Sequence, residues 1–295
     1  MGYTTPFSDS TFGRTVIDFR EEPPLIYKED RDINIGSTMA SYCDSIGNFL
    51  FYTNGIQLIG KDHERTENGN NLNTGPFAVS QYNSGYKVVQ SEFFLPKPGD
   101  SDTLYLFHES TENHPLYSIA RTVLHQTILD IAANNNLGRV VLKNDPLIMD
   151  GTFGGITATK HGNGRDWWVF NSIRSANRYN RLLFTDKGVE EIGEVEFGAD
   201  IPFTTALGFI VFSPDGSKFA RYEVKHGFSV FDFDRCSGTF ASPVFIPLPD
   251  ATLGGWLAIS PNSRFLYIAS NVEIFQVDLL ANDVAASKEL SLIHI

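Results

Sequence analysis

The chain has 295 residues and a formal net charge of −12, from 23 Lys and Arg against 35 Asp and Glu. Hydrophobic residues make up 42% and charged residues 20%, which describes a foldable globular chain rather than a disordered one. The acidic balance argues against nucleic acid as a partner, because nucleic-acid binding needs clustered Lys and Arg. No stretch approaches the roughly 20 consecutive apolar residues of a membrane-spanning helix, so no membrane span is predicted.

Most of the chain reads as short β-strands divided by turns that are rich in Gly, Asn, Asp and Pro. The 24 Phe, 11 Tyr and 3 Trp also favour β structure. Residues 118–133 have helical spacing of apolar side chains, yet the overlapping segment 116–124 is strand-like, so both remain open. Strands are predicted at 49–52, 88–95, 103–107, 167–170, 209–212, 219–224, 229–233, 256–259 and 265–268.

A turn motif recurs in the second half of the chain. Residues 213–217 (SPDGS) lie between two predicted strands, and a similar run begins at residue 260, which is 47 positions later. We expect Pro214 to fix φ in a tight hairpin, Asp215 to cap it and Gly216 to take a positive φ. Each copy is followed by an aromatic strand and then by an apolar-Asp-apolar segment. The aspartates of these segments, at 232 and 278 and again at 18, read as structural strand-end residues.

Weaker copies of the turn occur at 44–48, 98–102 and 162–166, each before an aromatic-rich strand. Five turns spaced roughly 45–65 residues apart indicate four-stranded blades, and a β-sandwich would not require this recurrence. We therefore predict a single all-β domain over residues 1–295, a β-propeller of four-stranded antiparallel blades. The predicted blades are 33–75, 76–145, 146–200, 201–250 and 251–295.

Residues 12–30 read as half of a further blade. The run 16–19 (VIDF) resembles 230–233 (VFDF), and a proline-led apolar segment follows each of them. No turn motif or inner strand pair precedes residue 12. Because propellers commonly close by pairing strands from their two ends, which removes the open sheet edge, the inner half should lie at the far end of the chain. We expect a C-terminally truncated ring of about five blades plus this half-blade, seven-bladed when complete.

Several segments together resemble a known family. They are 40–55 (ASYCDSIGNFLFYTNG), 67–69 (ENG), 95–99 (LPKPG), 156–168 (ITATKHGNGRDWW) and 231–238 (FDFDRCSG). Across nearly its whole length the chain resembles the N-terminal propeller of large secreted proteins from Bacteroidetes. Those proteins carry a C-terminal sorting domain of the type IX secretion, gliding-motility-associated kind. The resemblance implies an extracellular or cell-surface location, and it supplies no catalytic residues to carry over.

Arg165, Trp167 and Trp168 are the candidate ligand contacts. Neighbouring residues of a strand face opposite sides of its sheet. One tryptophan should therefore pack between blades, while the other would be free to stack on a sugar or peptide. The alternative is that both tryptophans only pack between blades.

No motif for a catalytic site, a cofactor or a metal is found, and none is predicted. The pair His108 and Glu109, and His63 with its acidic neighbours, can be drawn as acid–base pairs, but turn or strand-end positions explain them equally well. Turn aspartates such as Asp215 and Asp234 fit Asx turns as well as they fit calcium ligation. The two cysteines, at 43 and 236, are expected to be buried thiols rather than a disulfide.

These observations favour a non-catalytic binding or scaffold module of a secreted or cell-surface bacterial multidomain protein. Its loops at one end of the ring would engage a protein or a glycan. The alternative is a propeller enzyme acting on a carbohydrate, a lactone or an ester at the channel mouth, because such sites use residues scattered over several blades. A TolB-like accessory propeller, suggested by the turn at 213–216, is a third interpretation.

Overall fold

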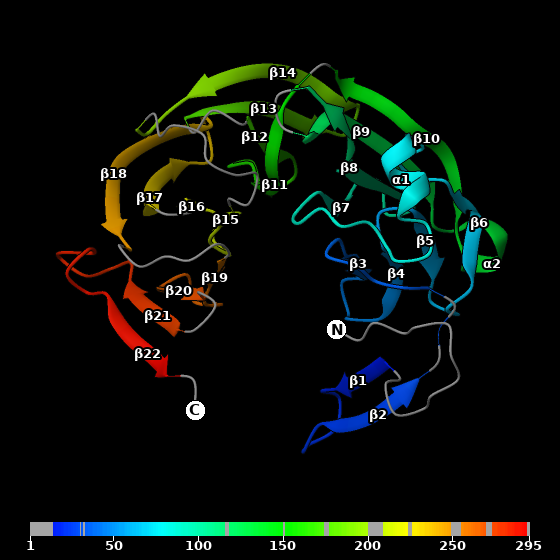
Figure 1. Ribbon diagram of the computed structural model, residues 1–295, viewed down its shortest axis with the longest axis horizontal. Coiled ribbons are helices and arrows are strands. Elements are labelled where there is room, and N and C mark those ends of the chain that lie inside the picture. The colour runs from blue at the N-terminus through cyan, green and yellow to red at the C-terminus, as the bar shows by residue number, and fades with distance from the viewer. Residues whose placement is uncertain are drawn as a thin grey trace. The chain divides into compact units, whose positions relative to one another are not determined.

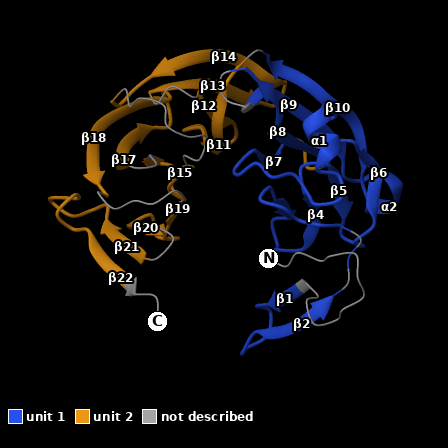
Figure 2. Ribbon diagram, viewed as in Figure 1, with its two compact units in different colours: residues 1–96, 102–150 blue, residues 97–101, 151–295 orange. Residues whose placement is uncertain are grey.

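The computed structural model describes residues 14–29, 31, 33–115, 118–149, 151–173, 177–199, 209–223, 226–248, 255–269 and 273–293. Over these residues the chain is almost wholly β, and its two helices are short (Figure 1). The chain forms two compact units (Figure 2). Unit 1 comprises residues 1–96 and 102–150, and unit 2 comprises residues 97–101 and 151–295. That both belong to one propeller domain over residues 1–295 stays a prediction.

Unit 1 contains an antiparallel hairpin and two groups of four antiparallel strands. The hairpin is β1 (Arg14–Asp18) with β2 (Leu25–Glu29). The first group is β3 (Ala40–Cys43), β4 (Phe49–Thr53), β5 (Gln57–Gly60) and β6 (Arg65–Asn70). The second group is β7 (Glu92–Pro96), β8 (Thr103–His114), β9 (Ser118–Asp130) and β10 (Arg139–Ile148). Helices α1 (Pro76–Ser80) and α2 (Ala133–Asn136) lie in the connections.

Unit 2 contains three groups of four antiparallel strands, which follow one another in chain order (Figure 1). Sheet P is β11 (Phe153–Lys160), β12 (Trp167–Ile173), β13 (Arg178–Thr185) and β14 (Gly188–Glu196). Sheet Q is β15 (Phe209–Phe212), β16 (Lys218–Glu223), β17 (Gly227–Asp234) and β18 (Thr239–Pro247). Sheet R is β19 (Trp256–Ile259), β20 (Phe265–Ala269), β21 (Glu273–Asp278) and β22 (Glu289–Ile293).

Most predicted strands lie within observed ones; one prediction needs correction, and one question that the sequence left open is decided. The strand predicted at 88–95 begins only at Glu92, because Gln90 has a positive φ of 49° that interrupts the extended backbone. Residues 118–130 form strand β9 and not a helix, because they pair with β8 from Thr103 to His114. The two strands of this hairpin have 12 and 13 residues, so they are longer than the predicted strand 103–107 and the strand-like segment 116–124. Residue 224 of another predicted strand lies outside the described residues.

The repeated turn forms as the sequence predicts. In the 213–217 turn, the Ser213 N–H donates to the Lys218 carbonyl at 2.9 Å, and Gly216 has φ 73°. The Asp215 carboxylate accepts the Ser217 N–H at 2.9 Å, which is the expected Asx cap.

The same five-residue step closes the other two first hairpins of unit 2. His161 donates to the Asp166 carbonyl at 2.9 Å, and Ser260 donates to the Phe265 carbonyl at 2.8 Å. We call Asp166, Lys218 and Phe265 the closing residues. They give the three sheets a common register. Residues that are the same number of positions after their closing residue therefore occupy equivalent places in the three sheets.

Sheets P and Q pack through aromatic side chains. Phe197 and Phe240 stack with ring centres 3.6 Å apart, and Phe219 and Phe231 meet Phe197 edge-on. Such contacts add dispersion and quadrupole attraction to the burial of apolar area. The buried members of this aromatic interface are Trp168, Phe170, Tyr179, Ile210, Phe212, Phe219, Phe231 and Phe233.

Sheets Q and R pack through mainly aliphatic side chains. Val230 of sheet Q and Val277 of sheet R are typical members, and Ala220 contributes only a methyl group. The buried members of this aliphatic interface are Ala220, Tyr222, Phe228, Val230, Ile246, Leu248, Leu266, Ile268, Val277 and Leu279.

We expect Phe219→Ala to lower the free energy of unfolding by about 3–5 kcal/mol, because it leaves a cavity in the aromatic interface. Phe245 of the same sheet is half-exposed, so Phe245→Ala should cost less than about 1 kcal/mol. Denaturant unfolding of the full chain, followed by fluorescence and circular dichroism, measures both. Equal losses in the two variants would contradict the packing described above.

Candidate binding site

The turns of unit 2 are hydrogen-bonded to one another across the sheets. The Asp215 N–H donates to the Ser263 hydroxyl at 3.0 Å, which joins the first turn of sheet Q to that of sheet R. Arg235, in the turn between β17 and β18, donates from Nη1 to the Asp215 carbonyl at 2.7 Å. Its own carbonyl accepts the Gly162 N–H at 2.8 Å, which joins sheet Q to sheet P. We call residues 160–167, 213–217, 235–238 and 260–264 the turn surface.

Arg165 is held on this surface by two carboxylates. Its Nε donates to Asp166 Oδ1 at 2.8 Å, and its Nη1 reaches Asp186 Oδ2 at 3.4 Å. The hydrogen bonds from Arg165 hold the pKa of Asp166 below its usual range, and Asn163 donates to the same carboxylate at 2.7 Å. The Arg165 side chain is 53% exposed, so one face of its guanidinium stays accessible while its direction is fixed.

Trp168 and Trp167 point to opposite sides of sheet P, as strand geometry predicts. Trp168 is only 4% exposed, belongs to the aromatic interface and donates its indole N–H to the Arg235 carbonyl at 2.8 Å. Trp167 is half-buried, and the Lys160 ammonium lies 3.8 Å from its ring centre. Lys160 also donates to the Arg165 carbonyl at 3.0 Å. The structure therefore brings Lys160, Arg165 and Trp167 together and places Trp168 in the packing; ligand contact by the three predicted residues stays a prediction.

The repeated strand-end aspartates are structural, as predicted. Asp232 pairs with Lys218 at 2.5 Å, and Asp278 pairs with Arg264 at 2.8 Å. The hydrogen bond from Lys218 is the largest of the effects that lower the pKa of Asp232. Asp18 pairs with Arg20 in the β1–β2 hairpin. In sheet Q the basic partner, Lys218, is the first residue of the second strand, β16. In sheet R it is Arg264, the residue before the second strand, β20. Each pair therefore connects the second strand of its sheet to the third strand.

His108 and Glu109 do not form an acid–base pair. The two lie in the middle of β8, not at a turn or strand end, and their side chains take opposite faces of the sheet. Asn73 donates its side-chain N–H to the Gly55 carbonyl at 3.0 Å, which turns Asn73 Oδ1 toward His108 Nδ1 at 2.9 Å. His108 Nδ1 must therefore carry the proton, and Nε2 accepts from the Thr127 hydroxyl at 2.9 Å. Burial holds the pKa of His108 well below its usual range, so the ring is a neutral structural group.

Glu109 is used structurally as well. Its Oε2 accepts from Arg121 Nη1 at 2.9 Å, and both side chains are buried. Arg121 also donates to the Val89 carbonyl at 2.6 Å. His63, the other histidine considered, lies 3.5 Å from Glu29 and not against its sequence neighbours. Neither acid–base pair drawn from the sequence is formed.

The cysteines differ from the expectation of buried thiols. Cys43 and Cys236 are both free and exposed. Cys43 is the last residue of β3, next to a turn, and Cys236 lies in the turn after β17, where its N–H is bound by Asp234 at 2.8 Å. A short side chain in or next to a turn stays at the surface, so the apolar character of cysteine alone does not predict whether it is buried.

Glu92 is a buried carboxyl that the sequence did not reveal. It is 7% exposed at the start of β7, and no described residue hydrogen-bonds to either of its carboxylate oxygens. Burial raises the pKa of Glu92 to about 8. Its cross-strand neighbour is His108, whose own neighbour on β9 is His125, so the three share one face of the sheet. The only sequence signal is a single charge at the head of an apolar strand, EFFLP.

We expect Glu92 to make stability fall as pH rises. Its folded pKa of about 8 lies above its unfolded value of 4.5, so its contribution is full below pH 4.5 and is lost as pH rises to about 8. Glu92→Gln should remove this loss. The free energy of unfolding of the variant, taken relative to the wild type, should therefore rise by about 3 kcal/mol between pH 4.5 and pH 7. Denaturant midpoints measured across this pH range for the wild type, Glu92→Gln and the half-exposed control Glu67→Gln test it. Parallel pH profiles for all three proteins would refute it.

No model of a known protein family matches the sequence, and no curated protein matches it. Solved structures do match. A putative 6-phosphogluconolactonase from Bacteroides uniformis has a TM-score of 0.50 at 16% identity, covering 97% of this chain and 79% of that chain. The β-propeller domain of Cps50 (Swd1) from Myceliophteria thermophila has a TM-score of 0.47 at 9% identity, covering 86% and 72%. An auxiliary nutrient binding protein from Bacteroides thetaiotaomicron has a TM-score of 0.45 at 13% identity, covering 87% and 57%.

The fold is a β-propeller. Successive groups of four antiparallel strands and the similarity to the Bacteroides uniformis structure confirm the predicted all-β class. At such low identity the similarity speaks for the fold and not for an activity. The number of blades and the truncation of the ring stay predictions. Within the described residues, no helix is both long and apolar enough to cross a membrane.

Proposed function

We propose that this chain is a non-catalytic binding module of a secreted or cell-surface bacterial protein, and that the turn surface of unit 2 engages its ligand. The cross-linked turns carry this proposal, because they hold loop side chains from three sheets on a rigid support. Binding residues occur most often on loops that a scaffold positions. A support that is ordered before binding also lowers the entropic cost of association.

Lys160, Arg165 and Trp167 form the centre of the proposed contact. Trp and Arg are enriched among the residues that dominate binding energy. Arg165 is already oriented by Asp166 and Asp186, so it loses little rotamer freedom when a ligand docks. Trp168 supports the contact from the opposite face of the strand, through its hydrogen bond to the Arg235 carbonyl.

Of the two predicted ligand classes, the geometry favours a protein over a glycan. Stacking on a sugar needs a free face of the indole, and the Lys160 ammonium lies 3.8 Å from the Trp167 ring centre. A protein ligand can instead bring a carboxylate to Lys160 and Arg165 while it packs against the edge of the ring. An extracellular location is part of the proposal, and it rests on the resemblance of the sequence segments.

Binding by the turn surface is tested with peptides selected from a random phage-displayed library on the full chain, and with a glycan array. We expect selected peptides to lose at least about tenfold in affinity on Trp167→Ala or Arg165→Ala. Trp256→Ala is the matched control, because Trp256 is a half-exposed tryptophan in the same unit. Selected peptides that bind Trp167→Ala and Arg165→Ala as tightly as the wild type would exclude the turn surface. Glycan binding without peptide binding would favour the other ligand class.

Glu92 favours a second candidate, a propeller enzyme acting on a carbohydrate, lactone or ester. A carboxyl with a pKa of about 8 is mostly protonated at pH 7 and can donate a proton. The similar Bacteroides uniformis protein, a putative 6-phosphogluconolactonase, makes 6-phosphogluconolactone a suitable probe. The enzyme hypothesis requires hydrolysis that Glu92→Gln abolishes. The binding-module proposal expects hydrolysis no faster than the spontaneous rate.

A further inference from the structure

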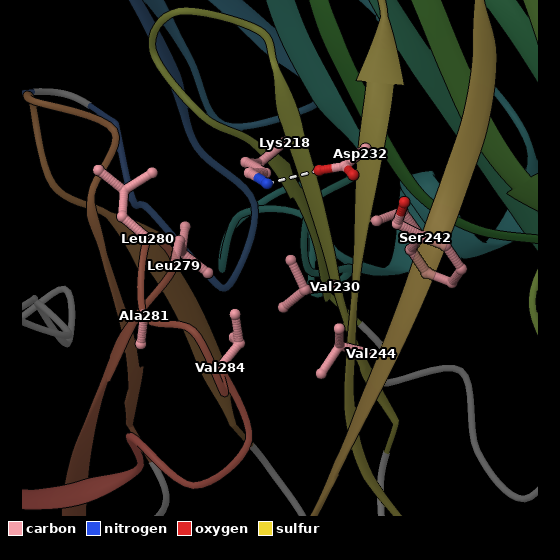
Figure 3. A pocket seen from close by; sticks show the side chains of 10 residues that line it. Lys218, Val230, Asp232, Ser242, Val244, Leu279, Leu280, Ala281 and Val284 are labelled. Atoms are coloured by element: carbon pink, nitrogen blue, oxygen red, sulfur yellow. Dashed lines mark hydrogen bonds and ion pairs between the residues drawn. The ribbon is translucent and has the colours of Figure 1, made fainter.

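The aliphatic interface contains an open cavity of about 220 Å³ (Figure 3). Seven of its ten lining residues are apolar, and the Lys218–Asp232 ion pair lies at one end. An enclosed apolar cavity of about 150 Å³ is large enough to bind benzene, so the volume of this open cavity is sufficient for a larger aromatic ring. The lining residues are Lys218, Val230, Phe231, Asp232, Ser242 and Val244 from sheet Q, with Leu279, Leu280, Ala281 and Val284 from the segment after β21.

The repeated register places a small residue, Ala220, across the strand pair from Val230, which lines the cavity. The second residue after the closing residue is Trp168 in sheet P, Ala220 in sheet Q and Tyr267 in sheet R. Trp168 fills the aromatic interface with its indole, whereas Ala220 presents only a methyl group to the aliphatic interface. Ala220, which corresponds to Trp168 of sheet P, is itself fully buried, and the cavity is lined by its cross-strand partner Val230.

The residues that face the indole of Trp168 in the aromatic interface have equivalents in the aliphatic interface. In the aromatic interface, the Trp168 ring lies so close to Gly238 that a Cβ there would come within 2.8 Å of it. Its N–H donates to the carbonyl of Arg235, the third residue after the paired Asp232. In sheet R, the third residue after the paired Asp278 is Ala281, and Ala281 lines the cavity.

The polar end of the cavity contains oxygen atoms that can accept a hydrogen bond from an uncharged group. Lys218 and Asp232 neutralise one another at 2.5 Å, so this end carries little net charge. Ser242 lies at a bulge of the β17–β18 pair with φ 51°, and it lines the cavity together with Asp232. Backbone strain of this kind is often found where a protein clamps a ligand. The Ser242 hydroxyl, the Asp232 carboxylate and the Ala281 carbonyl are oxygen acceptors on residues around the cavity.

We propose that this cavity receives a tryptophan side chain of a polypeptide partner, which takes in the aliphatic interface the place that Trp168 takes in the aromatic one. The indole ring would bury itself against Val230, Val244 and Val284, and its N–H would donate to an oxygen at the polar end. None of Lys160, Arg165 and Trp167 lines this cavity. The proposal is therefore independent of the ligand contact proposed for the turn surface.

The probe for this site is N-acetyl-L-tryptophan amide, titrated into the full chain by isothermal calorimetry and by protein NMR. We expect saturable binding at one site with a dissociation constant on the order of 1 mM or tighter, since the probe is a small ligand. N-acetyl-L-leucine amide should bind at least about tenfold more weakly, because it leaves part of the cavity unfilled. Absence of saturable binding of the tryptophan probe would overturn the proposal.

Two variants that fill the cavity locate the site. Ala220→Trp supplies the indole from within the chain, and Val244→Phe narrows the cavity from its wall; each should weaken the probe at least about tenfold. Val244→Phe keeps the test decisive if Ala220→Trp folds poorly. The matched control is Val141→Phe, at an exposed valine of unit 1, which should bind like the wild type. Unchanged binding to Val244→Phe would refute this location, and Trp167→Ala, which should bind normally, separates the site from the turn surface.

Discussion

The backbone hydrogen bond that closes each first hairpin of unit 2 determines which side chains meet between its sheets. The bond joins residues five positions apart in all three sheets, at His161, Ser213 and Ser260. Because side chains alternate along a strand, this register decides whether Trp168 or Val169 faces the next sheet. A slip by one residue would move the aromatic interface to the other face. The charge pairs at Asp232 and Asp278 fix the third strand in the same register.

The same register explains why two adjacent interfaces differ. Sheet Q presents mainly phenylalanines toward sheet P and mainly aliphatic side chains, together with Tyr222 and Phe228, toward sheet R. The first interface is filled by stacked and edge-on rings. The second leaves an open cavity lined by Val230, the cross-strand partner of Ala220. One repeated framework thus yields a packed interface that supports the turn surface and a neighbouring one with room for a partner's side chain.

Local features were predictable from the sequence, and non-local ones were not. The turn at 213–217 could be derived because proline, aspartate and glycine each impose a backbone preference within a few residues. The length of the β8–β9 hairpin and the burial of Glu92 depend on side chains from distant segments, such as the contact of His108 with Asn73. For the candidate site, alternation along β12 gave the opposed tryptophans. Nothing local indicated that Lys160 would cover Trp167, or that a cavity would open beside Val230.

Amide hydrogen exchange tests the common register most directly. The N–H groups of His161, Ser213 and Ser260 lie at strand ends beside turns, where unbonded amides exchange at nearly the rate of an unfolded chain. If each N–H closes its hairpin as described, all three should exchange as slowly as amides inside their own sheets. Exchange of these three amides at the rate of unbonded turn amides, while the sheets stay protected, would contradict the account.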